Sequence, residues 1–316
     1  MATPSRGVFV SQRTASLIVV AILAMIAVPA GITLHTVRHP ATLTVPENPS
    51  PYGYTWGLLL FIIPIVAIAF WFVPLERIAI PKRAFWRTIG ILAPLGFGLD
   101  FFFACRFFVF PNRQATLQID APALGRPVPV EEYIFYFTGF VVVLLIYLWL
   151  DEFWLNLYNV PDYKGEAEKA GRLLRFHPIS LVLAVALIGL AVVFKMVWGD
   201  GGFPGYFAVL VAGGLVPSAG FYPSVRSLIN WRALGLTMFL VLLISLLWEA
   251  TLALPYGWWN FQHPRMIGIF IGAWDDLPIE EIFVWIAVTY ATVIVFEVVK
   301  LWQASGKTMK AAFLGK

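Results

Sequence analysis

Cysteine and charge are both scarce in this sequence of 316 residues. Cys105 is the only cysteine, which excludes an intramolecular disulfide and a thiolate metal cluster. Its apolar surroundings predict a small core residue. Only 13% of the residues are charged, whereas about 25% is usual in a soluble domain. An ordinary soluble protein is therefore excluded.

The sequence also lacks the common motifs for nucleotides and metals. No G-x-G-x-x-G follows a predicted strand, and there is no P-loop. Asp275-Asp276 is only a pair, without the D-x-x-x-D or D-D-x-x-D pattern of prenyl-transfer enzymes. The four histidines have no metal-type spacing: His35, His39, His177 and His263. We predict neither a metal nor a cofactor.

Long apolar runs dominate instead. Apolar residues make up 60% of the chain, and the mean hydropathy is +0.80. Eight runs approach the roughly 20 residues that a membrane-spanning helix needs. We therefore predict an all-α, polytopic membrane helical bundle of about eight transmembrane helices in two tandem repeats. The runs are Ser16–Val37, Trp56–Pro74, Thr88–Phe110, Tyr133–Leu150, Ile179–Trp198, Phe207–Tyr222, Ala233–Leu254 and Ile282–Leu301.

Two of these runs need comment. The apolar part of the first is longer than the roughly 7–15 residues of a signal peptide, so we expect a retained helix. The sixth is the weakest, because glycines and prolines are expected to loosen or kink it: Gly213, Gly214, Pro217 and Gly220.

The distribution of basic residues predicts the orientation in the membrane. Most of the 22 lysines and arginines fall on one side of the predicted spans, together with both chain ends. The positive-inside rule then predicts a multi-pass protein of the cell membrane with cytoplasmic N- and C-termini. The basic residues form no continuous patch, so no nucleic acid is expected as a partner.

Two short acidic motifs repeat at the start of apolar runs. Pro129-Val130-Glu131-Glu132 and Pro278-Ile279-Glu280-Glu281 are offset by 149 residues, close to half the chain. One further acid lies 29 positions before each proline, namely Asp100 and Glu249. Four spans fit each half, which predicts parallel repeats related by an axis along the membrane normal. We expect repeats at 1–155 and 179–316, joined by a cytoplasmic linker at 156–178 within the hydrophilic connection Asp151–Pro178.

The position of these acids favours a functional role over a role in helix capping alone. Acids in a membrane are costly and usually functional. Proline suits the first helical turn, where the helix dipole favours a carboxylate, whereas burial and a neighbouring acid favour the protonated form. Adjacent glutamates lie about 100° apart around a helix, so at most one of each pair faces a central cavity. Which one does so is left open.

Each repeat can bring its intramembrane acid against the acids at the mouth of its last helix. Such a pair can share a proton, and a neutral acid in an apolar pocket can protonate an alkene. Aromatic faces can then stabilise the resulting carbocation. The loop Pro255–Pro278 is rich in aromatic residues, which form either an interfacial belt or a wall for a lipid-like substrate. Glu297 and Lys300 are interpreted as a structural i,i+3 pair.

At these motifs the chain resembles the membrane lycopene cyclase family, of the fused or heterodimeric type. The second half carries Trp248-Glu249, Gly257-Trp258-Trp259-Asn260-Phe261 and Leu277 to Phe283, and the first carries Asp100 and Pro129 to Phe135. The resemblance covers roughly residues 55–155 and 205–303. It implies cofactor-independent closure of an ionone ring at an end of lycopene. It also implies catalytic acids at Glu131, Glu132, Glu280, Glu281, Asp100 and Glu249, with substrate contacts at Trp258, Trp259, Phe261, Tyr133 and Phe135.

Other functions stay open at this point. Parallel repeats with intramembrane acids also fit a proton-coupled transporter, and a cyclase or hydratase of another isoprenoid fits the same acids. A structural or assembly membrane protein is a third class. The partners expected are a hydrophobic polyene within the bilayer and membrane lipids, and self-association into a homo-oligomer is not decided by the sequence.

Overall fold

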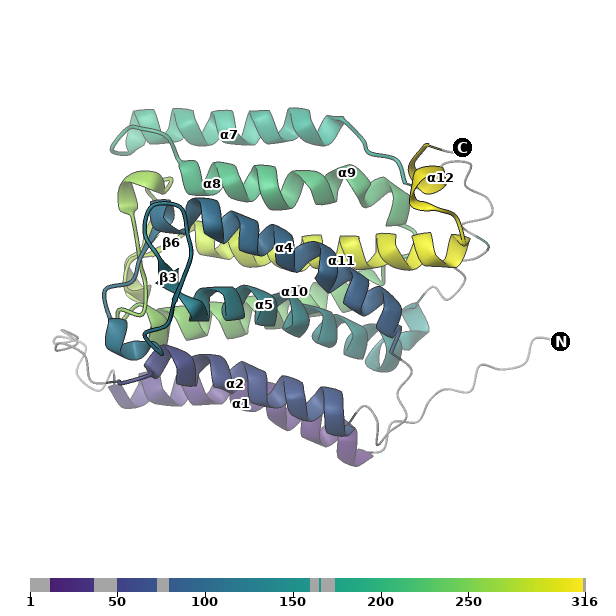
Figure 1. Ribbon diagram of the computed structural model, residues 1–316, viewed down its shortest axis with the longest axis horizontal. Coiled ribbons are helices and arrows are strands. Elements are labelled where there is room, and N and C mark those ends of the chain that lie inside the picture. Colours follow the sequence, from purple (N-terminus) through teal and green to yellow (C-terminus); the bar gives the residue numbers. More distant parts are fainter. Residues whose placement is uncertain (1–11, 37–49, 73–79, 160–164, 166–173, 315–316) are drawn as a thin grey trace.

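The computed structural model is predominantly helical and describes residues 12–36, 50–72, 80–159, 165 and 174–314 (Figure 1). Its long helices run side by side along one axis, with short strands gathered at one end. The predicted fold class, an all-α polytopic helical bundle, is confirmed. The repeat and linker boundaries stay predictions, and residues 160–164 and 166–173 of the linker lie outside the described part.

The first half of the chain contributes four long helical segments. Helices α2 and α5 each continue into a π-helical turn, so both are longer than the α-helical part alone. The segments are α1 (Gln12–Thr36), α2 (Gly53–Ala67) with η2 (Ile68–Phe72), α4 (Lys82–Phe107), and α5 (Val130–Trp149) with η4 (Leu150–Trp154).

The second half repeats this order. Its second segment contains a π-helical turn at Gly213 and Gly214, where the sequence predicted a weak or kinked span, and the helix nevertheless continues on both sides. The segments are α7 (Ile179–Trp198), α8 (Gly205–Leu210) with η6 (Val211–Leu215) and α9 (Val216–Val225), α10 (Trp231–Trp248) with η7 (Glu249–Ala253), and α11 (Glu280–Ser305), followed by the short α12 (Met309–Leu314).

Among the described residues, seven helices are long and apolar enough to cross a membrane. They include every predicted span except the first. The described part of α1 gives a shorter apolar helix, Val20–Gly31, so α1 is not among these seven. Large apolar side chains are exposed along α7 and η2, among them Phe70, Val185 and Trp198. A bundle with this apolar surface is a membrane-spanning protein.

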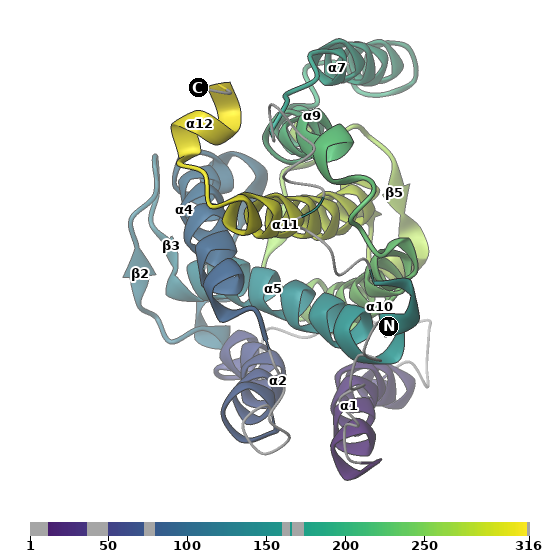
Figure 2. The same cartoon turned by 90° about the vertical axis from the view of Figure 1, so that its right-hand side faces the viewer.

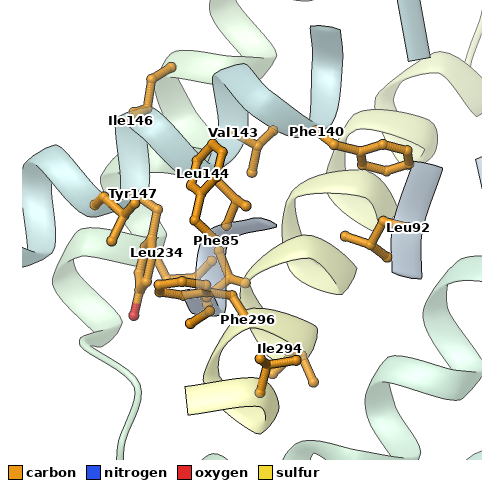
Figure 3. Packing of buried hydrophobic residues seen from close by; sticks show 14 of the residues in the cluster. Phe85, Leu92, Phe140, Val143, Leu144, Ile146, Tyr147, Leu234, Ile294 and Phe296 are labelled. Carbon is orange, nitrogen blue, oxygen red and sulfur yellow. The ribbon is translucent and has the colours of Figure 1, made fainter. Parts of the chain in front are cut away.

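The two final helices of the repeats, α5 and α11, pack against each other at the centre of the bundle (Figure 2). Each is flanked by the same elements: α4 and α10 contact both, α2 packs on α5, and α9 packs on α11. Phe85, Leu144 and Phe296 come from three different helices and converge in this core (Figure 3). The centre of the protein is therefore the interface between the repeats.

The outermost helices break this correspondence. Helix α7 packs on α9 in its own repeat, whereas α1 packs on α10 and η7 of the other repeat and contacts α2 only weakly. Figure 2 shows α1 and α2 as separate helices below α10 and α5. One consequence is a groove between α1 and α2, described below.

Short strands join the loops at one end of the bundle. Strand β1 (Phe108–Val109) pairs with β4 (Asn260–Phe261) across the two repeats. The backbone N–H of Asn112 donates to Gly257 O at 3.1 Å, and that of Gln262 donates to Phe107 O at 2.8 Å. Asn112 and Gln262 are 150 positions apart, and so are Phe107 and Gly257. The two bonds are therefore equivalent, and each loop holds the other in the same way.

A hairpin precedes the last helix of each repeat. Strand β2 (Asp120–Ala121) pairs with β3 (Val128–Pro129) just before α5, and β5 (Phe270–Ile271) pairs with β6 (Leu277–Pro278) just before α11. The expectation that each motif proline lies in the first helical turn is wrong. Pro129 caps α5 and Pro278 ends a strand, because both prolines close a hairpin.

The other end of the bundle contains a buried charged cluster. The hydrophilic connection was expected to begin at Asp151, after a span that ends at Leu150, but α5 extends through η4 to Trp154 and Asp151 is only 1% exposed. Lys300 Nζ lies 3.8 Å from Asp151 Oδ2 and 3.3 Å from Glu297 Oε1. The ion pair between Glu297 and Lys300 within α11 is confirmed, and the pair between Lys300 and Asp151 joins α11 to the end of α5.

Candidate functional site

A cavity of about 540 Å³ lies between the repeats at the end of the bundle that carries the strands. Three buried carboxyl groups line it, those of Glu132, Glu249 and Glu281. The remaining wall is almost entirely aromatic or apolar, with Phe108, Phe135, Tyr136, Gly139, Phe140, Tyr206, Val284, Trp259, Trp285 and Val288. Acids from both halves of the chain therefore meet in one apolar enclosure.

Glu132 and Glu281 occupy equivalent places in this cavity. The hydroxyl of Tyr54 donates to Glu132 Oε1 at 2.7 Å, and the hydroxyl of Tyr206 donates to Glu281 Oε1 at 2.7 Å. Each tyrosine is the second residue of a helix, α2 or α8, that packs beside the acidic helix of its own repeat. The two halves thus supply the same pair of groups, a carboxyl and a phenol.

Glu131 and Glu280 are also buried, but they point to the loops. Glu131 Oε1 accepts hydrogen bonds from Leu117 N at 2.6 Å and from Thr55 Oγ1 at 2.7 Å. Glu280 Oε1 accepts one from the backbone N–H of Ile267. Neither residue lines the cavity. One glutamate of each pair therefore faces the cavity while its neighbour holds the loop before the hairpin, which is what their angular separation on a helix allows.

The two intramembrane acids differ in their surroundings. Glu249 Oε1 accepts a hydrogen bond from Trp285 Nε1 at 2.8 Å, and its carboxyl group is close enough to that of Glu281 for the two to interact electrostatically. Two carboxyl groups this close together can share one proton. Asp100 is 1% exposed and close enough to Glu132 to interact electrostatically. Among the described residues, neither of its oxygens has a hydrogen-bond partner, and Asp100 does not line the cavity.

The predicted aromatic contacts fall into two groups. Trp259 and Phe135 line the cavity, and the ring of Phe135 stacks on Trp248 with the centroids 5.5 Å apart. Trp258, Phe261 and Tyr133 do not line it. Trp258 stacks on Tyr54, Phe261 lies beside Phe108 and Tyr206, and Tyr133 donates to the carbonyl of Pro122. These three support the wall or the loops behind it.

Sequence reasoning missed several groups of the site. Tyr54, Tyr206, Tyr136 and Trp285 were not singled out. A signal for the first two exists, because Gly53-Tyr54 and Gly205-Tyr206 repeat the same dipeptide at an offset of 152. No comparable signal marks Trp285, which is one aromatic residue among many in the last span.

A buried lysine supports the second acidic loop. Lys195 of α7 is fully buried, donates a hydrogen bond to the carbonyl of Met266 and lies 2.9 Å from Asp200 Oδ1. The hydrogen bond from Lys195 holds the pKa of the exposed Asp200 carboxyl below its usual value. Because Met266 precedes Ile267, this lysine fixes the peptide that donates to Glu280.

In the part of the chain that the structure describes, no group of three or more His, Cys, Asp or Glu side chains has an arrangement that could hold a metal ion. Comparison with known proteins gives no further guide, since no family model, no curated protein and no solved structure matches the chain. The arrangement itself offers proton donors, proton acceptors and aromatic faces around one apolar space.

Proposed function

We propose that this protein is a carotenoid cyclase, an intramolecular lyase or isomerase that forms ionone rings at the ends of lycopene or a related linear polyene. The observation that carries the proposal is the meeting of Glu132, Glu249 and Glu281 in one aromatic-walled cavity between the repeats. The motif resemblance supports the same reaction. Carotenoid biosynthesis is then the pathway class in which the protein acts.

The proposed reaction needs only proton transfer. A protonated carboxyl, Glu281 or Glu132, donates its proton to the terminal double bond, so an O–H bond breaks and a C–H bond forms. An internal double bond attacks the carbocation, which closes the ring and moves the charge onto a ring carbon. A carboxylate of the cavity then takes a proton from the neighbouring ring carbon. The product is an isomer of the substrate, and no electrons leave or enter.

The wall of the cavity suits this intermediate. Faces of Phe135, Trp259 and Trp285 surround the acids, and aromatic faces attract a cation. The apolar lining also limits water, which would otherwise capture the carbocation and give a hydrated product. Tyr54 and Tyr206 hold one oxygen of their carboxyl partners, so the other oxygen can be directed at the substrate.

A proton-coupled transporter fits the structure less well. Its acids would be expected along a path through the membrane. Here the acidic cavity and the cluster around Asp151 and Glu297 lie at opposite ends of α5 and α11, about 28 Å apart along α5. Between them the core is filled by apolar side chains such as Leu144, Val293 and Ile294. This separation favours the enzyme.

The proposed setting is the cell membrane, with both termini in the cytoplasm and the acidic cavity toward the outer side. The distribution of lysine and arginine supports this orientation. The substrate would then reach the cavity from the bilayer, where an acyclic carotenoid dissolves.

The test is expression of the full chain in bacteria that accumulate lycopene, followed by pigment chromatography and mass spectrometry. A second arm uses washed membranes in deuterated water without nicotinamide or flavin. We expect cyclic products with the mass of lycopene in ordinary water. In deuterated water, we expect one retained deuterium for each ring, because protonation and proton loss occur at different carbons.

Two results would overturn the proposal. Unchanged lycopene, with the protein present in the membrane by immunoblot, would exclude it as a cyclase of this substrate. A product heavier by one water molecule would identify a hydratase instead. The Glu132→Gln/Glu281→Gln double variant serves as the control for background cyclisation.

A further inference from the structure

A second, larger hollow lies beside the acidic cavity. It is an apolar groove of about 790 Å³ between α1, α2, η2 and α5, lined by residues such as Met25, Ile65, Ile68, Leu145 and Trp149. The groove exists because α1 packs on α10 and η7 and only weakly on α2. Among the described residues of its lining only Glu152, near the far end, is charged.

A smaller cavity of about 440 Å³ lies between the two. It shares Phe135, Gly139 and Trp285 with the acidic cavity, and it shares Val142 with the groove. Along α2 the lining continues without interruption from Leu58 and Phe61 of this cavity to Pro64, Ile65 and Ile68 of the groove. The three spaces therefore follow one another along the same faces of α2 and α5.

The length of this path matches an extended hydrocarbon chain that reaches across the membrane. From Glu132 to Glu152 the path follows 20 residues of α5 and η4, or about 30 Å. The hydrocarbon core of a bilayer has about the same thickness. A chain with one end at the acids could therefore lie along these hollows over most of the thickness of the bilayer.

Gly139 lies where the acidic cavity meets the connecting cavity. A β-carbon at this position would be 3.9 Å from the ring of Trp285, which is ordinary contact distance. Alanine therefore fits, whereas a larger side chain would have to occupy the space that both cavities share. The glycine has no unusual backbone conformation within α5, so its lack of a side chain is what distinguishes it.

We propose that Gly139 is a specificity-determining residue, which keeps open the passage from the acidic cavity into the groove between α1, α2 and α5. An acyclic isoprenoid bound with one end at the acids extends through this passage, so the groove selects long chains over short ones. This inference rests on the proposed function, and it adds where the unreacted part of the chain lies and which residue admits it.

The test compares a long and a short ligand with the same terminal group, lycopene and geranylgeranyl acetate. Full-length protein is purified in detergent, and Kd is obtained from the ligand-dependent rise in unfolding temperature. The variants are Gly139→Ala, Gly139→Phe and Ile65→Trp, since Ile65 lines the groove but not the acidic cavity. The matched control is Gly189→Phe on α7, where a β-carbon would meet no neighbouring atom within 4 Å.

We expect Gly139→Phe and Ile65→Trp to weaken lycopene binding by about tenfold or more while changing the Kd of geranylgeranyl acetate less than about threefold. Gly189→Phe should bind lycopene as the wild type does, and Gly139→Ala should weaken lycopene binding less than Gly139→Phe does. If Gly139→Phe does not fold, Ile65→Trp decides the question alone.

Unchanged lycopene binding in both bulky variants would overturn the inference, as would an equal loss of both ligands. These outcomes are separable from failure of the proposed function. A wild type that converts lycopene but shows no effect of Gly139→Phe and Ile65→Trp leaves the cyclase intact and removes only the passage. A wild type that does not convert lycopene removes the cyclase itself.

Discussion

The two repeats have the same order of helices, but their intramembrane acids, Glu249 and Asp100, differ in type and surroundings. In the second repeat, Glu249 lines the cavity, accepts a hydrogen bond from Trp285 and interacts electrostatically with Glu281, which lines the same cavity. In the first, the corresponding Asp100 is shorter by one methylene, has no hydrogen-bond partner among the described residues and stays behind the wall. The equivalent of Trp285, at an offset of 149, is Tyr136.

This difference indicates a division of roles. A carboxyl that shares a proton with its neighbour is suited to hold that proton in an apolar site. Within the proposed function, we therefore expect Glu281 to be the better donor, with Glu249 as its partner in holding the proton. Glu132, held by Tyr54 alone in a comparable geometry, is the better candidate to accept the proton that the ring loses. Glu132 and Glu281 are equivalent acids of the two halves, and the side chains around them differ.

The largest expected effect tests the donor directly. Glu281→Gln should lower cyclisation by about 10²–10⁴-fold, because the amide can still accept from Tyr206 but cannot donate a carboxyl proton. Glu132→Gln should lower it less. The measurement is the initial rate in membranes with lycopene, normalised to the amount of protein. Equal rates for Glu281→Gln and the wild type would remove Glu281 as the donor, and a larger loss in Glu132→Gln would reverse the assignment.

A second comparison concerns the intramembrane acids. Glu249→Gln should reduce the rate by about tenfold or more, since Glu281 loses the neighbouring carboxyl group in the cavity with which it can share a proton. Asp100→Asn should change it by less than about threefold, because Asp100 lacks hydrogen-bond partners among the described residues and does not line the cavity. The same rate assay applies. Equal losses in both variants would show that the two repeats use these acids alike.

The smallest expected effects are those of substitutions at Glu131 and Glu280, which hold the loops. These substitutions should change the stability of the protein. Glu280→Ala leaves the buried N–H of Ile267 without its acceptor, which should lower the free energy of unfolding by about 1–3 kcal/mol. Glu131→Ala should cost more, because Leu117 and Thr55 both donate to Glu131. The corresponding Gln variants keep a carbonyl acceptor and should lose less. Denaturant unfolding in detergent measures these differences, and equal costs for Ala and Gln would contradict a hydrogen-bonding role.

The helical fold was predictable because membrane spans are encoded locally, in runs of about 20 apolar residues. Seven of the eight predicted spans correspond to long apolar helices, while α1 has a shorter apolar stretch among the described residues. The extension of α5 to Trp154 was missed because Asp151 looked like the start of a hydrophilic loop. Its charge is buried next to Lys300 from α11, a partner 149 positions away that hydropathy does not reveal.

The candidate site was partly predictable from the repeated motif. The acids could be found from their spacing, but which glutamate of each pair faces the cavity depends on loops that donate to the other one, through Leu117 N and Ile267 N. Similarly, Trp258 and Trp259 are neighbours in sequence, yet only Trp259 lines the cavity. Side-chain direction at the end of a loop is set by tertiary packing, which the sequence pattern does not contain.

The pairing of β1 with β4 has a consequence for how this chain can evolve. Main-chain groups form many of the bonds between these loops, including those of Asn112 with Gly257 and Gln262 with Phe107, and the side chains of Asn112 and Gln262 add bonds to main-chain carbonyls of the other half. Such a seam constrains the path of each loop but few of its side chains. One loop can therefore accumulate tryptophans while its counterpart does without them, and the halves still join in register. Duplication followed by independent drift would then yield a protein in which one cavity is lined by two halves with different side chains.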